Sequence, residues 1–186
     1  MNDQLQIGTG DDPIGVEVVR DGRLRTRIHW EWNGDQVRIR APRRVPQDQL
    51  DKHVAEIVEE VKRRRARART RADADLEAMA RRINKKHFRG EISWHSIRWV
   101  SNMRRRLGSC TVGGPTDGDI RISDRVKDWP GWVVEYVVAH ELTHRRYPNH
   151  SKEFWAYAGQ YPKAERARGF ILGLAFQLGE DAGDWL

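Results

Sequence analysis

The sequence predicts an α+β fold, and three features of its apolar pattern support this prediction. Residues 14–41 alternate apolar and charged residues, as strands do, and residues 47–88 carry apolar side chains at helical spacing. Strand patterns and then helix patterns follow over residues 92–176. A chain of 186 residues is long enough for one domain with a substantial core. We therefore expect residues 1–186 to form a single domain.

The first patterned segment, residues 14–41, predicts a β-meander that follows an irregular start rich in Gly and Asp. Asp21-Gly22 and Asn33-Gly34 are typical hairpin turns. The strands expected around these turns are Ile14–Val19, Leu24–Trp32 and Gln36–Ala41. Val37 and Ile39 alternate with arginines, which indicates a sheet with one solvent-exposed face.

Residues 47–88 predict a helical segment. Its first apolar face comprises Leu50, Val54, Ile57, Val58 and Val61. The helical pattern resumes at Leu76, and we expect a break between Arg64 and Ala74. The intervening Lys62–Arg71 stretch carries seven positive charges in ten residues. It is interpreted either as a solvated helix face or as a binding site for a polyanion such as nucleic acid.

The last part of the chain, residues 92–176, predicts two strands and three helices. We expect strands at Ile92–Val100 and Asp119–Ser123, separated by a glycine-rich loop over Met103–Gly118. A strongly apolar helix begins near Pro130, and shorter amphipathic helices follow Asn149 or Ser151 and then Pro162.

The helix after Pro130 contains His140-Glu141-Leu142-Thr143-His144, which fits the H-E-x-x-H pattern. A spacing of four residues advances a helix by about 400°, so both imidazoles project from nearly the same face and can bind one metal ion. Glu141 lies about 100° around the helix from His140, where its carboxylate can act as a general base on a water held by the metal.

A catalytic zinc site needs a third protein ligand and one open position. His150 is the best candidate, because Pro148 ends the helix and allows the chain to turn back towards the metal. Glu153 is a weaker alternative. The predicted site therefore has His140, His144 and His150 as metal ligands, one zinc ion per chain, and Glu141 as the catalytic base.

Composition limits the remaining classes of protein. Cys110 is the only cysteine, which excludes an intramolecular disulfide and a cysteine-built zinc site. The chain has no apolar run long enough to cross a membrane, so we expect a cytoplasmic protein with no membrane partner. The net charge of +7 suggests anionic partners, and the sequence does not predict the oligomeric state.

Two motifs resemble the YgjP-like metallopeptidase domain family. The stretch Val137–His144 followed by Asn149–Trp155 is similar to the family signature, and Leu107-Gly108-Ser109-Cys110 resembles its W-G-S-C element with Leu in place of Trp. The resemblance covers roughly residues 95–176. It implies a zincin-like core in which a small, mainly antiparallel sheet backs the active-site helix. SprT-like proteases are a more distant comparison.

Three functional hypotheses follow. The first is a zinc metallopeptidase acting on peptides or proteins, which the resemblance favours. The second is a zinc hydrolase of nucleotides or other phosphorylated substrates, since the same ligands suit phosphoanhydrides. The third is a basic nucleic-acid-associated protein with a structural zinc. Asp119 is a candidate hydrogen-bond partner of a ligand histidine. Tyr147 or Tyr157 could donate a hydrogen bond to the oxyanion, with packing as the alternative role. Phe154 and Trp155 are expected to be core anchors.

Overall fold

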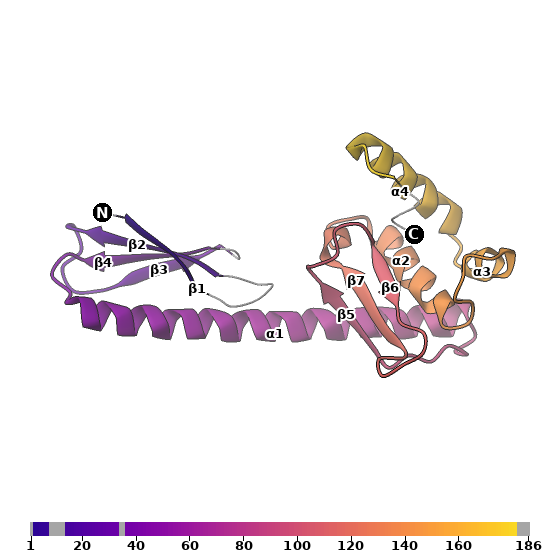
Figure 1. The fold of residues 1–186 in the computed structure, drawn as a ribbon, viewed down its shortest axis with the longest axis horizontal. Coiled ribbons are helices and arrows are strands. Elements are labelled where there is room, and N and C mark those ends of the chain that lie inside the picture. The colour runs from indigo at the N-terminus through magenta and orange to yellow at the C-terminus, as the bar shows by residue number, and fades with distance from the viewer. Residues whose placement is uncertain (1, 8–13, 34–35, 182–186) are drawn as a thin grey trace. The chain divides into compact units, whose positions relative to one another are not determined.

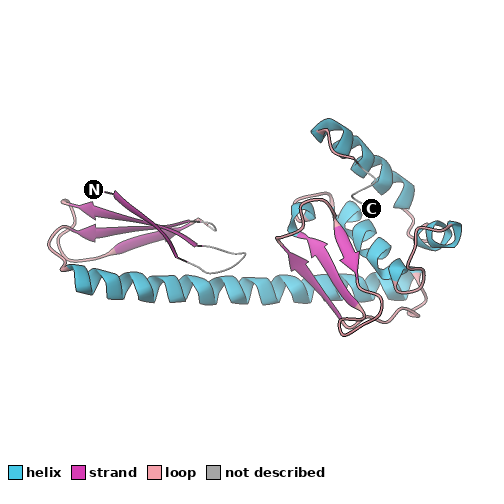
Figure 2. Cartoon of the chain, viewed as in Figure 1, coloured by secondary structure: helices cyan, strands magenta, loops and turns pink. Residues whose placement is uncertain are grey.

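The fold is that of an α+β protein, described by a computed structural model over residues 2–7, 14–33 and 36–181. Four α-helices and two small sheets are present in these residues (Figure 1), and Figure 2 shows their distribution along the chain. The predicted α+β class is confirmed. The chain divides into two compact units, Met1–Ala68 and Arg69–Leu186. The single domain expected from the length remains a prediction.

The N-terminal unit holds a four-stranded sheet with the order β1-β2-β4-β3. Its strands are β1 (Asn2–Ile7), β2 (Ile14–Asp21), β3 (His29–Trp32) and β4 (Gln36–Pro42). The sequence predicted an irregular start, but Asn2–Ile7 forms a strand that pairs antiparallel with β2. Gly34 of the predicted second turn lies outside the described residues.

The pairing in this sheet differs from the predicted meander. β4 pairs antiparallel with β3, as a hairpin should, but it pairs parallel with β2. The strand predicted from Leu24 begins only at His29, so residues 22–28 form a polar connection long enough to carry the chain past β4. Burial explains why β4 is a central strand and β3 an edge strand. The side chains of Val37 and Ile39 in β4 are fully buried, whereas β3 exposes alternate residues.

Helix α1 (Gln47–His87) is continuous, and the predicted break between Arg64 and Ala74 is wrong. Arginine and alanine are strong helix formers, so the intervening residues stay helical although they add no apolar face. Within the N-terminal unit, the start of α1 packs on β2 and β4. The helical residues buried there are Leu50, Val54, Val58 and Val61.

In the second unit the last turns of α1 join another core through Leu76, Ala80 and Ile83. Asn84 fixes the segment that follows the helix. Its buried side-chain amide donates to the Ile92 carbonyl at 2.7 Å and accepts from the Ile92 N–H at 3.2 Å. The chain therefore leaves α1 in a defined direction before the second sheet begins.

The second sheet has three strands in the order β5-β7-β6, namely β5 (Ser96–Val100), β6 (Gly108–Cys110) and β7 (Asp119–Ser123). β7 pairs parallel with β5 and antiparallel with β6, so this sheet is mixed and not mainly antiparallel. The loop predicted over Met103–Gly118 contains β6. This strand has three residues and no apolar alternation, so the sequence pattern could not predict it.

Three helices complete the second unit after the 3₁₀ turn Asp124–Val126. Helix α2 (Gly131–His144) is buried along most of its length, which its dense apolar sequence predicts, and it packs on β6 and β7. Helices α3 (Lys152–Ala158) and α4 (Ala164–Leu178) also pack in this unit, and the Ser151 side chain caps the first of them. Of the helices described, none is both long and apolar enough to span a membrane.

Candidate metal centre

Helix α2 and the turn that follows it bring three histidines together. His140 and His144 lie one helical turn apart near the end of α2, and His150 precedes Ser151, the N-cap of α3. One potential ligand atom from each residue lies within 4.8 Å of the others. His140 is buried, His144 is half-buried and His150 is exposed. The cluster therefore has a buried side and a side open to solvent.

Two of these rings face one another through the nitrogen that would bind a metal. The Nε2 atoms of His140 and His150 are 3.0 Å apart. His144 uses its other nitrogen, Nδ1, to donate to the backbone carbonyls of Tyr147 at 3.3 Å and Pro148 at 3.1 Å. These bonds leave its Nε2 without a hydrogen, so a lone pair is available for a metal.

His150 is held by ring contacts. Its imidazole stacks on Trp155, with centroids 5.2 Å apart and an interplanar angle of 20°. The Arg168 guanidinium lies 4.3 Å from the centroid of the same indole. Phe154 packs edge-on against His150 at 4.7 Å and is fully buried. Phe154 thus has the core position predicted for it, whereas half-buried Trp155 supports a member of the cluster directly.

The pKa values of the three histidines favour neutral rings. Burial lowers the pKa of His140 well below its ordinary value, and the neighbouring His144 and His150 lower it further. Burial also lowers the pKa of His144 and of His150. A neutral imidazole is the form that binds a metal ion. The His140 Nδ1 is buried without a hydrogen-bond partner in the described part of the chain.

Glu141 is a buried carboxylate beside the cluster. Burial raises its pKa to about 8, opposed by the charge of Arg106. Its Oε2 atom is buried and has no hydrogen-bond partner among the described residues. A buried acid without a partner is costly for folding alone, whereas a nearby cation would stabilise its ionised form. Three convergent neutral imidazoles and this acid therefore fit a divalent metal ion.

Gly108 of β6 makes space for the Glu141 side chain. A Cβ atom at position 108 would lie 2.7 Å from both Cγ and Cδ of Glu141, well inside van der Waals contact. Any other residue would therefore push the carboxylate aside. The sequence marks Gly108 only as part of the motif shared with the resembled family, and no local pattern reveals its contact with Glu141.

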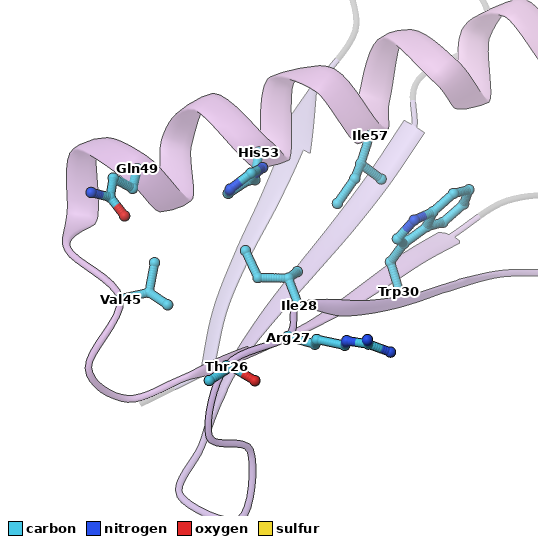
Figure 3. Close-up of a pocket in the computed structure, with 8 residues that line it drawn as sticks. All are labelled: Thr26, Arg27, Ile28, Trp30, Val45, Gln49, His53 and Ile57. Atoms are coloured by element: carbon cyan, nitrogen blue, oxygen red, sulfur yellow. The ribbon is translucent and has the colours of Figure 1, made fainter.

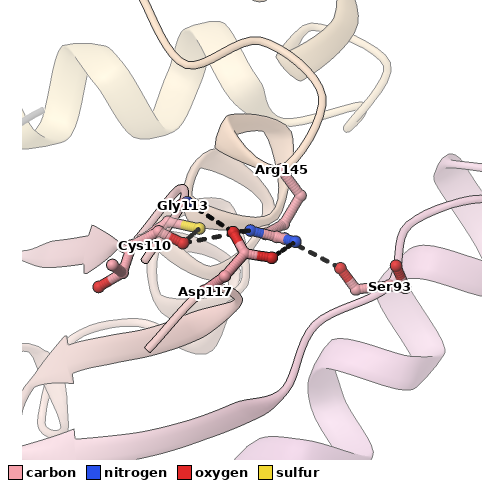
Figure 4. Close-up of polar contacts among 6 residues, drawn as sticks. Ser93, Cys110, Gly113, Asp117 and Arg145 are labelled. Carbon is pink, nitrogen blue, oxygen red and sulfur yellow. Dashed lines mark hydrogen bonds and ion pairs between the residues drawn. The ribbon is translucent and has the colours of Figure 1, made fainter. Parts of the chain in front are cut away.

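Arg145, the residue after His144, connects the end of α2 to the turn between β6 and β7 (Figure 4). Its guanidinium forms a bidentate ion pair with Asp117 at 2.8 and 2.9 Å. It also donates to the backbone carbonyls of Ser93 and Thr111, each at 3.1 Å. The pair, together with the Gly113 N–H, holds the pKa of Asp117 at about 2. This network was not predicted from sequence.

Three other residues singled out in the sequence, Asp119, Cys110 and Tyr157, have structural environments that do not indicate a role in the metal centre. The Asp119 carboxylate accepts from the Ser96 hydroxyl at 2.7 Å, while backbone carbonyls hold His144. Burial, reinforced by the Glu141 charge, raises the pKa of the half-buried Cys110 thiol to about 11, so it stays protonated at neutral pH. Tyr157 stacks on Phe88 at 5.0 Å, which is a packing role.

Leu107, which stands where the resembled family has Trp, is fully buried and part of the core of the second unit. Exposed Glu153 lies on the first turn of α3, and the cluster of potential metal ligands found among the described residues consists of the three histidines. Tyr147 contacts Tyr157 edge-on at 5.6 Å. Glu153, the weaker alternative ligand, is thus not part of the three-histidine cluster.

A pocket of about 440 Å³ lies in the N-terminal unit (Figure 3), and none of the three clustered histidines lines it. It lies between the residues that lead into β3 and the first turns of α1. Ile28, Val45 and Ile57 give it an apolar body, with Arg27 and His53 among its polar lining residues. No sequence pattern indicates this pocket.

An H-E-x-x-H helix packed on a small sheet, with a third histidine completing a cluster, is typical of metal-dependent hydrolases. Residues 68–169 match the family described as YgjP-like, metallopeptidase domain, and the chain belongs to this family. The resemblance inferred from the two motifs is confirmed.

No curated protein matches the chain. A solved structure, the metallopeptidase zymogen of Pyrococcus abyssi abylysin, is similar at 18% sequence identity and a TM-score of 0.46. The similarity covers 57% of this chain and 97% of that one.

Proposed function

We propose that this protein is a zinc-dependent metallopeptidase with His140, His144 and His150 as metal ligands and Glu141 as general base. The observation that carries the proposal is the cluster of three imidazoles, with ligand atoms within 4.8 Å, next to a buried carboxylate. Membership of a metallopeptidase family makes a peptide bond the first substrate to test. Zinc is the first metal to test because three histidines with one open position are a common catalytic zinc site.

The proposed chemistry assigns separate tasks to the chain's own residues. A zinc ion held by the three histidines would supply Lewis-acid polarisation of water and of the scissile carbonyl. The Glu141 carboxylate accepts a proton from the attacking water and then donates it to the leaving amine nitrogen. Gly108 leaves room for that carboxylate, and the Trp155 stack orients His150. The exposed side of the cluster admits substrate.

The proposal is tested on purified protein stripped of metal with a chelator and titrated with zinc. We expect binding of one zinc per chain and recovery of hydrolysis on a mixed peptide library, followed by mass spectrometry. Nucleoside triphosphates are assayed in parallel for phosphate release. Zinc-dependent release of phosphate without peptide cleavage would replace the peptidase proposal with the phosphoanhydride alternative. Failure to bind zinc would contradict both.

Replacing Gly108 by Ala is expected to lower the rate of peptide hydrolysis by roughly a hundredfold, the effect of displacing a catalytic group by about 1 Å. The added methyl group occupies the space of the Glu141 side chain. Initial rates and zinc affinity are measured together, and the zinc affinity should change little. Ser109→Ala, on the next residue of β6, is the matched control. Wild-type rates in Gly108→Ala would show that the Glu141 position is not critical.

Zinc affinity is expected to stay nearly constant from pH 8 to about 6.5 and to fall only at lower pH. The histidine pKa values lie below their ordinary value of 6.5, so protons compete with the metal only in more acidic solution. Calorimetric titration in a non-coordinating buffer measures this dependence. A steady loss of affinity beginning at pH 8 would mean that groups other than these imidazoles bind the metal.

A further inference from the structure

The stretch Lys62–Arg71 lies on the part of α1 that contributes to neither hydrophobic core. Val61 is the last residue of α1 in the first core, and Leu76 is its first fully buried residue in the second. Nine of the ten residues between Lys62 and Arg71 are exposed, and Arg65 is half-buried. This stretch, called the basic segment below, is therefore accessible around most of the helix.

The charge pattern of the basic segment differs from that of an ordinary solvated helix. Solvated helices usually mix acidic and basic residues, which attract one another at spacings of three and four. The basic segment has seven cations and no acid in ten residues. Seven like charges on one helix repel one another, so this composition costs stability unless an anion neutralises it.

Acidic side chains of the preceding turn of α1 pair with the cations at the N-terminal end of the basic segment. Glu59 pairs with Lys62 at 2.7 Å, and Glu60 pairs with Arg63 at 3.0 Å and Arg64 at 2.8 Å. These pairs involve three of the seven cations, and the second half of the segment begins beyond Arg65.

That second half carries the available cations. Within the part of the chain that the structure describes, no acidic side chain pairs with Arg67, Arg69 or Arg71. All three side chains are exposed. Arg67 and Arg71 are four residues apart and lie on nearly the same side of α1, whereas Arg69, midway between them, lies on the opposite side.

We propose that the basic segment binds the phosphate backbone of nucleic acid through Arg67, Arg69 and Arg71. Six of its seven cations are arginines, whose planar guanidinium groups match phosphate oxygens in bidentate pairs. Ten helical residues span about 15 Å, and duplex DNA carries one negative charge per roughly 1.7 Å. Contacts to phosphate carry no sequence information, so binding is expected to be independent of base sequence.

Two other anionic partners fit the basic segment less well. A helix that lies on an anionic membrane needs a large apolar face, and the only apolar residues here are Ala66 and Ala68. A stable protein partner needs aromatic or aliphatic anchors, which the segment also lacks. A polyphosphate backbone requires neither. The inference concerns α1 alone and is independent of the proposed zinc chemistry.

The test compares the full-length protein with Arg67→Gln/Arg69→Gln/Arg71→Gln. Glutamine keeps a high helix propensity, and circular dichroism checks that helix content is retained. The matched control is Arg23→Gln/Arg25→Gln/Arg27→Gln, which removes the same charge from three exposed arginines of the N-terminal unit. Probes are fluorescently labelled 20-base-pair DNA and RNA duplexes, measured by anisotropy between 50 and 200 mM salt.

We expect the parent to bind at least one duplex, and the basic-segment variant to lose at least about tenfold in affinity at low salt. The slope of log affinity against log salt should become shallower by up to about 3 as phosphate contacts are lost. Binding of DNA or of RNA alone would identify the source of the phosphate. The proposal is overturned if both triple variants behave alike, or if polyglutamate or anionic vesicles compete as well as the duplexes. Zinc binding and peptidase assays report separately on the proposed function.

Discussion

Replacing Glu141 by Gln is expected to reduce peptide hydrolysis by roughly 10²–10⁴-fold while zinc binding is retained, because the amide cannot accept a proton from water. Glutamine has the same shape as the glutamate that packs against Gly108, so the geometry of the cluster should persist. The experiment measures initial rates on a cleaved peptide and zinc content by metal analysis of the same preparation.

The stability of this variant gives a second readout. Burial raises the pKa of Glu141 to about 8, so ionising this group in the metal-free protein is unfavourable. A neutral amide avoids that cost, and Glu141→Gln should therefore be at least as stable to heat as the parent without metal. Glu153→Gln, at an exposed position on the first turn of α3, is the control and should keep full activity. A fully active Glu141→Gln would rule out the proposed base.

Replacing His150 by Ala is expected to weaken zinc binding by more than about a hundredfold, beyond the 10–100-fold typical when a residue supporting a ligand is lost. The His150 ring is exposed and held by stacking on Trp155, so its removal should change the melting temperature of the metal-free protein little. Competition with a chromogenic chelator measures the affinity.

His53→Ala is the control for this experiment, because it removes an exposed imidazole from the first turns of α1 in the N-terminal unit. It should leave zinc affinity unchanged. If His150→Ala bound zinc as tightly as the parent, the third ligand would have to be another residue. Glu153 would then be the next position to replace, since it lies three residues further along the chain.

Local sequence rules were sufficient to predict the three-histidine cluster. His140 and His144 face the same way because a helix repeats every 3.6 residues, and the structure keeps both within α2. His150 was placed by the break at Pro148, and its Nε2 lies 3.0 Å from that of His140. The ligand and base roles assigned to these residues remain predictions for the experiments above.

Features that depend on contacts between distant residues could not be predicted. Gly108 and Glu141 meet only because β6 packs on α2, and a three-residue strand has no apolar alternation to mark it. The parallel pairing of β2 with β4 could not be predicted for the same reason. Strand propensity predicts where strands form and not which strands pair. In α1, the helix propensity of arginine and alanine keeps the helix continuous where the apolar pattern is interrupted between Val61 and Leu76.

The ion pair between Arg145 and Asp117 has a consequence for the energetics of substrate binding. The turn it fastens has glycines at positions 113, 114 and 118 with positive φ angles, a composition that would otherwise allow many conformations. Hydrogen bonds from Gly113 to Asp117 and from Gly118 to Thr111 restrict it further. The entropy of ordering this turn is therefore lost on folding, and a substrate that bound at this edge beside β6 would not incur that cost again.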